Sequence, residues 1–201
     1  MSDLYEIRAK YSKSTITIYQ AYASNIAAPA LERQEFVKPF SFHRMTWIKP
    51  SFLWLMYRSI WGQKKSQENI LAVQIERTGW DHALSLGVLT HPEPSVYGNP
   101  DEWKSQFDNA SVHIQWDTER NIRGSAMNRF SIQVGISRHL IREYVEDWIV
   151  KIDDLTPTVT KIRNLIRSGK MTEAKRLLPP EKPYPVEPKT ARRIMMNDKQ
   201  S

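Results

Sequence analysis

The amino-acid sequence predicts an α+β protein, in which strands are flanked by helices. Segments rich in β-branched and aromatic residues, typical of strands, are separated by short segments with apolar residues at 3- and 4-residue spacing. The 201 residues are 40% hydrophobic and 25% charged, which is typical of a globular domain of ordinary size. We therefore expect one domain over residues 1–155 and a basic, helical and proline-rich tail over residues 156–201.

The net charge of +7 is concentrated near the C-terminal end of the sequence. Residues 1–160 hold 18 Lys and Arg against 18 Asp and Glu, while residues 161–201 hold 11 against 4. A movable cationic arm gives sequence-independent affinity for phosphate backbones, although many basic tails are only solvated. This distribution makes nucleic acid the expected partner, and a protein partner that binds the tail is the alternative.

Several classes of chemistry are disfavoured by what the sequence lacks. The absence of cysteine excludes disulfides and thiol catalysis. The five histidines are scattered without an HExxH motif, so we expect no metal site, and no glycine-rich phosphate loop occurs. No apolar run of about 18 residues and no signal-peptide pattern is present, so we expect a cytoplasmic protein without membrane contact.

The first strand is expected over residues 15–22, TITIYQAY. Its alternation places Gln20 and Tyr22 on one face and Tyr19 on the other. A short helix over residues 25–34 and then a loop should connect this strand to the next part of the chain.

The stretch over residues 44–61, RMTWIKPSFLWLMYRSIW, combines three tryptophans with the cations Arg44, Lys49 and Arg58. An ordinary core helix does not need three permanent charges, and an ordinary solvated face does not need three indoles. Because arginine binds anions bidentately and also stacks on aromatic rings, the combination indicates the wall of a pocket for an anionic ligand.

Pro50 divides this stretch into an extended segment, residues 44–48, and a helix over residues 51–61. One stripe of the helix should face the core, and it consists of Phe52, Leu55, Met56 and Ile60. The adjacent stripe of Trp54, Arg58 and Trp61 would place Arg58 between two indole planes, facing a ligand. The alternative is that the helix is buried on two sides and that Arg58 pairs with a carboxylate.

The remaining elements follow from the same patterns. Further strands are expected over residues 69–77, 112–116 and 128–136, the second of them followed by a polar turn over residues 117–123. Helices are expected over residues 80–86, 101–107, 138–152, 159–168 and 171–178. A surface loop over residues 91–101, a polyproline-like segment from residue 177 to 189 and about ten disordered residues at the end complete the prediction.

Polar side chains on the predicted strands can meet the cations of the central stretch. The strand over residues 128–136 places Arg129 and Gln133 on one face, and the mouth of the preceding strand carries Asp117 and Glu119. Arginines suit phosphates, amides suit hydroxyl or carboxamide groups, and aromatic planes suit a base. The set therefore fits a ligand with phosphates and ribose hydroxyls, although each of these side chains could equally be solvated.

A family resemblance rests on six motifs: IRAKYSKSTITIYQAY, RMTWIKPSFLWLMYRSIW, VHIQWDTER, SIQVGI, the DDLT step and LLPPEKPYP. In this order they resemble a bacterial and fungal family defined as a domain of unknown function. The order of the strands is similar to that of ADP-ribosyltransferases, and this implies a mixed, largely antiparallel split sheet flanked by helices. That resemblance implies NAD as substrate, with Tyr19 and Gln20 at the first-strand site and Gln133 at the position of the usual late-strand Glu. Since Gln replaces that acid, the acid would come from Asp117 or Glu119, or the activity would be lost.

The leading hypothesis is an NAD-dependent ADP-ribosyltransferase-like enzyme that modifies RNA or DNA, in the manner of a toxin or a defence enzyme. Arg44 and Arg58 would bind the pyrophosphate, and Trp47 or Tyr19 would stack on nicotinamide. The remaining roles fall to Gln20 and Gln133 for the amide or ribose, Asp117 or Glu119 as the acid, and Arg8 and Lys49 as further NAD-binding cations. The alternatives are a non-catalytic module that binds single-stranded nucleic acid, or a well-packed core whose tail binds a protein.

Overall fold

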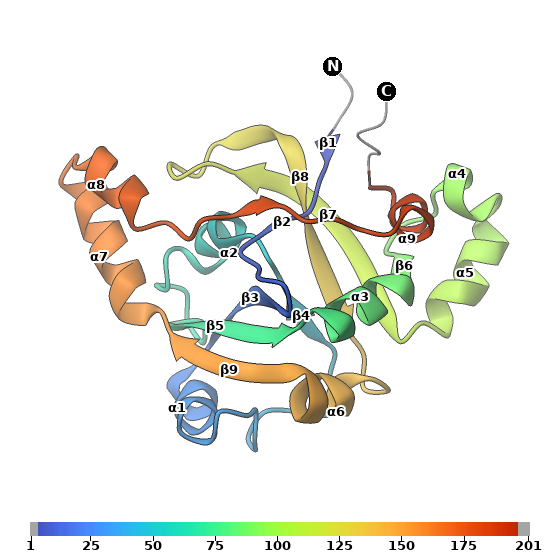
Figure 1. Cartoon of the computed structure of the whole chain (residues 1–201), viewed down its shortest axis with the longest axis horizontal. Helices are drawn as coiled ribbons and strands as arrows, with labels where there is room; N and C mark the ends of the chain where they lie inside the picture. Colours follow the sequence, from blue (N-terminus) through green and yellow to red (C-terminus); the bar gives the residue numbers. More distant parts are fainter. Residues whose placement is uncertain (1–3, 197–201) are drawn as a thin grey trace.

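The computed structural model describes residues 4–196, whose main strands form two sheets (Figure 1). The first sheet has three antiparallel strands in the order β3 (Thr15–Tyr22), β5 (Asn69–Glu76) and β9 (Ile149–Asp154). Both faces of β3 are covered, because Ile18 lies in the larger apolar core and Tyr19 lies in a second, smaller one. The predicted strands over residues 15–22 and 69–77 are thus confirmed.

The second sheet is mixed and has β8 (Ala126–Ile136) at its centre. β8 pairs antiparallel with β7 (Val112–Arg120) over nearly its whole length. β1 (Leu4–Tyr5) pairs parallel with the first half of β8, and β6 (Gly87–Leu89) pairs parallel with β7. The expectation of a mixed, largely antiparallel sheet in an α+β fold is therefore confirmed.

The two sheets are joined at the short strand β4 (Thr46–Ile48). β4 pairs antiparallel with the second half of β8, where Trp47 lies opposite Gly135. Directly after β4, the backbone N–H of Tyr19 donates to the carbonyl oxygen of Lys49 at 2.7 Å. The chain around residues 46–49 therefore contacts both sheets, and the whole forms one curled arrangement around this junction.

Helices cover the outer faces of the sheets and the two ends of the molecule, with α7 and α8 at one end and α4 and α5 at the other (Figure 1). The helices near the junction are α1 (Ser24–Arg33), α2 (Phe52–Ser59) and α3 (Arg77–Ser85). The others are α4 (Pro94–Tyr97), α5 (Pro100–Asp108), α6 (Ile141–Glu143), α7 (Thr156–Arg167), α8 (Met171–Arg176) and α9 (Pro188–Arg193). α2 begins after Ser51, whose hydroxyl accepts a hydrogen bond from the N–H of Trp54 at 3.2 Å.

The predicted helix over residues 138–152 is wrong at both ends and is helical only over residues 141–148. Only the short α6 and a five-residue π-helix, Tyr144–Trp148, are helical, and β9 begins at Ile149. The apolar residues of this segment satisfy a helical period, but Ile149, Val150 and Ile152 are β-branched and pack well in a strand. Pairing with β5 supplies backbone hydrogen bonds that the sequence pattern does not reveal.

Three smaller predictions also differ from the structure. The segment expected to turn at residue 117 continues β7 to Arg120, because Asp117 pairs with β8 across a ladder that is irregular only after Thr118. Ile60, expected in the core, is 57% exposed, since it ends α2 in a left-handed conformation with a φ of 53°. Within the loop expected over residues 91–101, Pro94 begins the short α4.

The C-terminal segment packs on the body of the protein and is not a free arm over its described part. The segment expected to be polyproline-like forms β10 (Lys182–Pro183), which pairs antiparallel with β2 (Arg8–Ala9). We call residues 179–196 the strap, because Figure 1 shows them crossing the molecule from α8 to α9. The indole N–H of Trp116 donates to the carbonyl oxygen of Ile194 in the strap at 2.7 Å. The end that was expected to be disordered is described up to residue 196, and residues 197–201 lie outside the described part.

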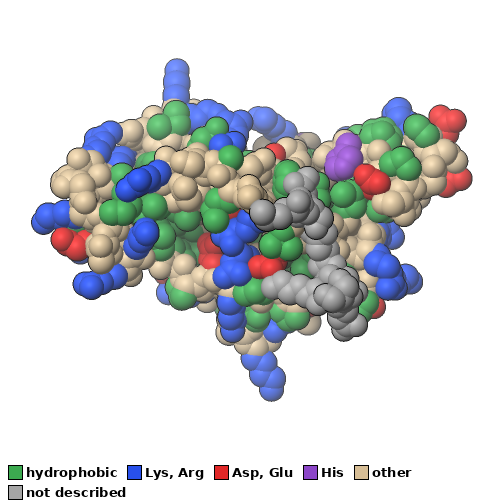
Figure 2. All heavy atoms as spheres, turned by 90° about the horizontal axis from the view of Figure 1, so that it is seen from above, with side chains coloured by type: hydrophobic (Ala, Val, Ile, Leu, Met, Phe, Trp, Pro, Cys, Tyr) green, Lys and Arg blue, Asp and Glu red, His purple; other side chains and the backbone are tan. Residues whose placement is uncertain are grey.

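The basic residues do not gather into a single stripe on the face drawn in Figure 2. On this face Lys and Arg side chains are interrupted by apolar, polar and acidic ones.

Candidate functional site

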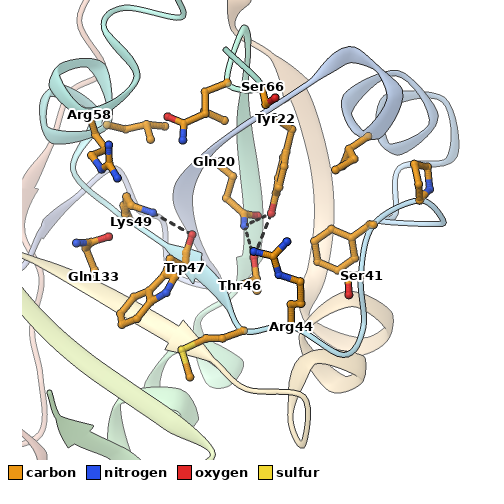
Figure 3. A pocket seen from close by; sticks show the side chains of 17 residues that line it. Gln20, Tyr22, Ser41, Arg44, Thr46, Trp47, Lys49, Arg58, Ser66 and Gln133 are labelled. Atoms are coloured by element: carbon orange, nitrogen blue, oxygen red, sulfur yellow. Dashed lines mark hydrogen bonds between the residues drawn. The ribbon is translucent and has the colours of Figure 1, made fainter. Parts of the chain in front are cut away.

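A cavity of about 490 Å³ lies at the junction of the two sheets, over β4. Ligand sites of small molecules usually fall in this size range. β3, β4, α2, β8 and the loop before β4 contribute its walls. Its lining residues are Gln20, Ala21, Tyr22, Ile26, Pro39, Phe40, Ser41, Arg44, Met45, Thr46, Trp47, Lys49, Leu55, Arg58, Ser66, Gln67 and Gln133 (Figure 3). We call this cavity the junction pocket.

The junction pocket is lined by three cations and by no carboxylate. Figure 3 shows Arg58 and Lys49 on one side and Arg44 on the other. Within residues 4–196, none of these three cations forms an ion pair with an acidic side chain. The alternative in which a carboxylate pairs with Arg58 is therefore wrong, and the uncompensated positive charge suits an anionic ligand.

The floor of the pocket is a hydrogen-bonded group of two hydroxyls and one amide. Gln20 donates from Nε2 to the hydroxyls of Tyr22 and Thr46, both at 2.8 Å, and the hydroxyl of Tyr144 donates to Gln20 Oε1 at 2.6 Å. Burial raises the pKa of Tyr22 to about 12, so its hydroxyl stays protonated at neutral pH. Because both the donor and the acceptor atoms of the Gln20 amide have partners, Gln20 positions the hydroxyls of the pocket floor.

Lys49 is the buried cation of the pocket, with 8% of its surface exposed. Its Nζ donates to the carbonyl oxygen of Trp47 at 3.1 Å and lies 5.6 Å from the ring centroid of Trp54. Burial, and secondly the charge of Arg58, lower its pKa to about 7, while Asp117 acts in the opposite direction. The cation that lies over an indole is thus Lys49, whereas the sequence had predicted that Arg58 would lie between two indoles.

The three tryptophans of the central stretch do not act together. Trp47 lines the pocket and is partly buried, but Trp54 is 7% exposed beneath Lys49. Trp61 packs edge-on against Phe52 in the smaller core, at a centroid distance of 6.3 Å. Only Trp47 is therefore available to a ligand in this pocket.

Asp117 lies behind Gln133 and fixes its orientation. The Asp117 carboxylate accepts hydrogen bonds from Gln115 Nε2 at 2.9 Å and from Gln133 Nε2. In Figure 3 the amide oxygen of Gln133 is on the side of the pocket. Asp117, predicted from the sequence as a candidate acid, does not line the pocket and contacts it through Gln133.

Besides Asp117, three of the predicted site residues lie outside the junction pocket. Tyr19 is 1% exposed and packs edge-on against Phe52 on the opposite face of β3. Glu119 is 4% exposed and accepts a hydrogen bond from the backbone N–H of Arg120 at 2.8 Å. Arg8 pairs with Glu6 at 2.9 Å and donates to the backbone carbonyl of Glu181 in the strap at 2.9 Å. The proposed stacking role of Tyr19 and the ligand contacts of Arg8 do not fit these positions.

Arg8 and Glu119 belong instead to a second polar group, beneath the strap. Glu181 accepts a hydrogen bond from the N–H of Phe52 at 2.7 Å, which attaches the strap to the first residue of α2. Burial and the neighbouring Glu119 raise the pKa of Glu181 to about 8, against the effects of that hydrogen bond and of the cations Arg8 and Arg129. This group holds the strap and α2 together.

Sequence reasoning missed several residues of the pocket. Thr46 lies within the segment predicted to be extended, but its contact with Gln20 joins β4 to a strand of the other sheet. Phe40 and Ser41 come from a loop, and Tyr144, which supports Gln20 from outside the pocket lining, lies in the segment predicted as a continuous helix. Contacts of this kind depend on tertiary folding, and no local pattern indicates them.

A metal site and a membrane-spanning helix are the two features that the sequence does not lead us to expect. Among residues 4–196, no group of three or more His, Asp or Glu side chains is placed to hold a metal ion. In the same part of the chain, no helix has both the length and the apolar character needed to cross a bilayer.

Comparison with known proteins gives one match. Neither the curated proteins nor the solved structures contain a match to this chain. A family described as Domain of unknown function (DUF4291) matches residues 6–184, which include the junction pocket, β9 and the first part of the strap. Because the match covers most of the sequence, the chain belongs to the DUF4291 family of domains of unknown function.

Proposed function

We propose that this protein is an ADP-ribosyltransferase-like enzyme that binds NAD in the junction pocket and transfers ADP-ribose to RNA or DNA. One observation carries the proposal: three cations without carboxylate partners line a cavity of about 490 Å³ whose floor consists of fixed hydroxyl groups. An anionic dinucleotide with ribose hydroxyls has the matching chemistry. The reaction class is inferred from the strand order, which resembles that of ADP-ribosyltransferases.

Different residues of the pocket bind different parts of NAD in this proposal. Arg44 and Arg58, on its two sides, bind phosphate oxygens, and Trp47 supplies an aromatic plane for a ring. The hydroxyls of Tyr22 and Thr46 are oriented by Gln20 and face ribose oxygens. These roles replace the ones that Tyr19 and Arg8 had in the interpretation of the sequence.

NAD is the substrate in this proposal, and it supplies a glycosidic bond that breaks as nicotinamide leaves with the bonding electrons. The chain holds the two sides of the substrate at Arg44 and Arg58, and Gln133 presents its amide oxygen toward the ribose. Asp117, behind Gln133, provides the nearby negative charge that steadies positive charge developing on the sugar. A hydroxyl or base nitrogen of the nucleic acid forms the new bond and loses its proton.

Cations on ordered helices support the choice of nucleic acid as acceptor. α7, α8 and the turn between them carry exposed basic residues, namely Lys161, Arg167, Lys170, Lys175 and Arg176. Phosphate backbones bind such surfaces without sequence preference. We therefore assign recruitment of the nucleic acid to these ordered helices, whereas the sequence suggested a movable cationic arm.

The second candidate, a non-catalytic module that stacks bases on tryptophans, has less support. Base-stacking platforms need accessible rings. Trp54 is buried under Lys49, and Trp61 packs against Phe52 away from the pocket, so Trp47 is the tryptophan of this stretch that lines the pocket.

Mass spectrometry of total RNA and DNA after incubation with the protein and NAD tests the proposal. The expected result is a mass gain of one ADP-ribose on one of the polymers. Arg58→Ala should abolish the gain because it removes a phosphate contact, while Lys13→Ala, an exposed cation outside both the pocket and the basic helices, should keep most of it. Unmodified polymers and intact NAD with the wild-type protein would contradict the proposed reaction.

A further inference from the structure

Lys49 has surroundings that differ from those of the exposed lysines of the protein. It follows β4 directly, and its backbone is fixed by the hydrogen bond from Tyr19 N–H to its carbonyl oxygen. Its side chain is 8% exposed, lies over the Trp54 ring and lines the junction pocket. The amine is therefore held in place and is accessible from the cavity.

Burial and the charge of Arg58 disfavour the protonated form of the Lys49 amine, whereas Asp117 favours it. Its Nζ has one hydrogen-bond partner among the described residues, the carbonyl oxygen of Trp47. Arg58 on α2 adds a like charge, and Asp117 on β7 is already bonded to two glutamine amides. Burial has the largest effect, and together these surroundings bring the pKa of Lys49 to about 7. A substantial fraction of the amine is then neutral at physiological pH and carries a lone pair.

We propose that Lys49 is a nucleophilic amine that forms an imine with a phosphate-bearing aldehyde or ketone bound in the junction pocket. The amine nitrogen attacks the carbonyl carbon, a C–N bond forms, and the carbonyl oxygen leaves as water with the two amine protons. The product is a C=N bond that water can hydrolyse again. Lysines activated by desolvation and by an adjacent cation act in this way in other proteins.

The phosphate requirement comes from the other cations of the pocket. Arg58 lies on the same side as Lys49, and Arg44 lies across the cavity (Figure 3). Neither forms an ion pair within the described chain. A phosphate bound at Arg58 would hold the attached carbonyl group near the amine. This inference rests on the amine and the cavity and does not require that NAD be a substrate.

Trapping with borohydride tests the proposal directly. The protein is incubated with pyridoxal 5′-phosphate at pH 7, reduced with sodium borohydride, digested and mapped by mass spectrometry. Hydride converts the C=N bond to a stable secondary amine. We expect Lys49 to be labelled at least about tenfold faster than the exposed Lys65 and Lys161, because far more of its amine is neutral.

Two comparisons separate a built site from general lysine reactivity. Pyridoxal without its phosphate should label Lys49 more slowly, and Arg58→Gln should reduce labelling by the phosphate ester more than labelling by pyridoxal. Lys49→Arg keeps a cation but cannot form an imine. The adduct should therefore disappear from the peptide that contains position 49 and remain on the other labelled peptides. Labelling of wild-type Lys49 that is no faster than that of Lys65 and Lys161 would overturn the proposal, and so would equal labelling by pyridoxal and its phosphate ester. Because the readout is an adduct, the result is independent of ADP-ribosyl transfer.

Discussion

Gly135 leaves the space in which Trp47 lies. The two residues are opposite each other in the β4–β8 ladder. A Cβ atom at position 135 would lie 3.0 Å from Cη2 of Trp47 and 2.7 Å from Sδ of Met45. Cβ atoms in proteins are essentially never found closer than 3.0 Å to another heavy atom. Any residue larger than glycine at position 135 must therefore displace Met45 or the indole of Trp47. The only tryptophan of the pocket is thus positioned by the absence of a side chain on the neighbouring strand.

Gly135→Ala should therefore weaken ligand binding in the junction pocket as well as lower stability. Overpacking of this kind costs about 1–3 kcal/mol of unfolding free energy. Gly169→Ala is a matched control, because Gly169 has a φ of 74° and a Cβ atom added there would meet nothing within 4 Å beyond its chain neighbours, so only backbone strain is added. Denaturant unfolding and NAD titration of both variants check the prediction. Equal binding by Gly135→Ala and Gly169→Ala would show that the position of Trp47 does not matter.

At the scale of elements, α2 carries Arg58 into the pocket and is attached to the strap at its first residue. The N–H of Phe52 donates to the carboxylate of Glu181. A helix N-terminus stabilises a carboxylate, but here burial and Glu119 dominate and raise the pKa of Glu181 from 4.5 to about 8. Between these two pH values the folded protein binds more protons than the unfolded chain. The stabilising effect of protonated Glu181 is therefore complete below pH 4.5 and is lost as the pH rises toward 8.

Glu181→Gln should isolate this effect, because glutamine keeps an oxygen that can accept from Phe52 N–H but carries no charge. We expect the variant and the wild type to have similar stability near pH 4.5, and the variant to gain about 1–3 kcal/mol relative to the wild type by pH 8. Chemical unfolding at a series of pH values measures the difference.

Glu187→Gln is a control in which the stability at pH 8 should change in the opposite direction. Glu187 is exposed, and the hydrogen bonds that it accepts from the backbone of Lys189 and Thr190 lower its pKa. Its carboxylate therefore stabilises the fold above pH 4.5, and the glutamine variant should be less stable than the wild type at pH 8. A Glu181→Gln curve parallel to the wild-type curve would contradict the buried environment of Glu181.

The sequence predicted some elements well because their signals are local. The strand over residues 15–22 has a strict alternation, and Pro50 with Ser51 marks the start of α2. β9 was missed because the apolar spacing of residues 138–152 also fits a helix, and only pairing with β5 decides between the two. The short β10 and β2 have no signal of their own, since each consists of two residues that pair across the chain.

The candidate site shows the same division between local and tertiary information. Arg44, Trp47, Lys49 and Arg58 were found together because they lie in one stretch of 18 residues, and the structure places all four around one cavity. Gln20 and Gln133 join them from strands whose faces alternation predicts. Glu119 was misplaced because the ladder irregularity after Thr118 changes the register beyond Asp117, and alternation cannot reveal that change.

At the scale of the whole molecule, the strap covers the larger apolar core, to which its Tyr184 and Ile194 belong. Tyr184 of the strap is 1% exposed, and its hydroxyl donates to Asp81 at 2.7 Å and accepts from Arg77 at 3.1 Å. Its ring packs edge-on against Tyr11 and Trp80. Removing the chain after Pro180 would therefore expose the core, and such a truncation cannot serve as a neutral removal of a basic arm.

Tyr184→Ala should lower the unfolding free energy by about 3–5 kcal/mol, as expected for loss of a buried aromatic side chain. Tyr184→Phe keeps the ring and loses only the hydroxyl bonds, so a smaller loss of about 1–3 kcal/mol is expected. Thermal and urea unfolding of the two variants measure both values. A stability of Tyr184→Ala close to that of the wild type would show that the strap does not support the cores.

Calorimetric titration of NAD into the purified protein tests the central claim most directly, namely that the cations of the junction pocket bind an anionic nucleotide. The wild type should bind NAD, and both Arg58→Ala and Arg44→Ala should bind it about 10- to 100-fold more weakly, because each loses a charged hydrogen bond to phosphate. The exposed control Arg176→Ala should bind like the wild type. The absence of NAD binding by the wild type, or equal affinities in all four proteins, would contradict the claim.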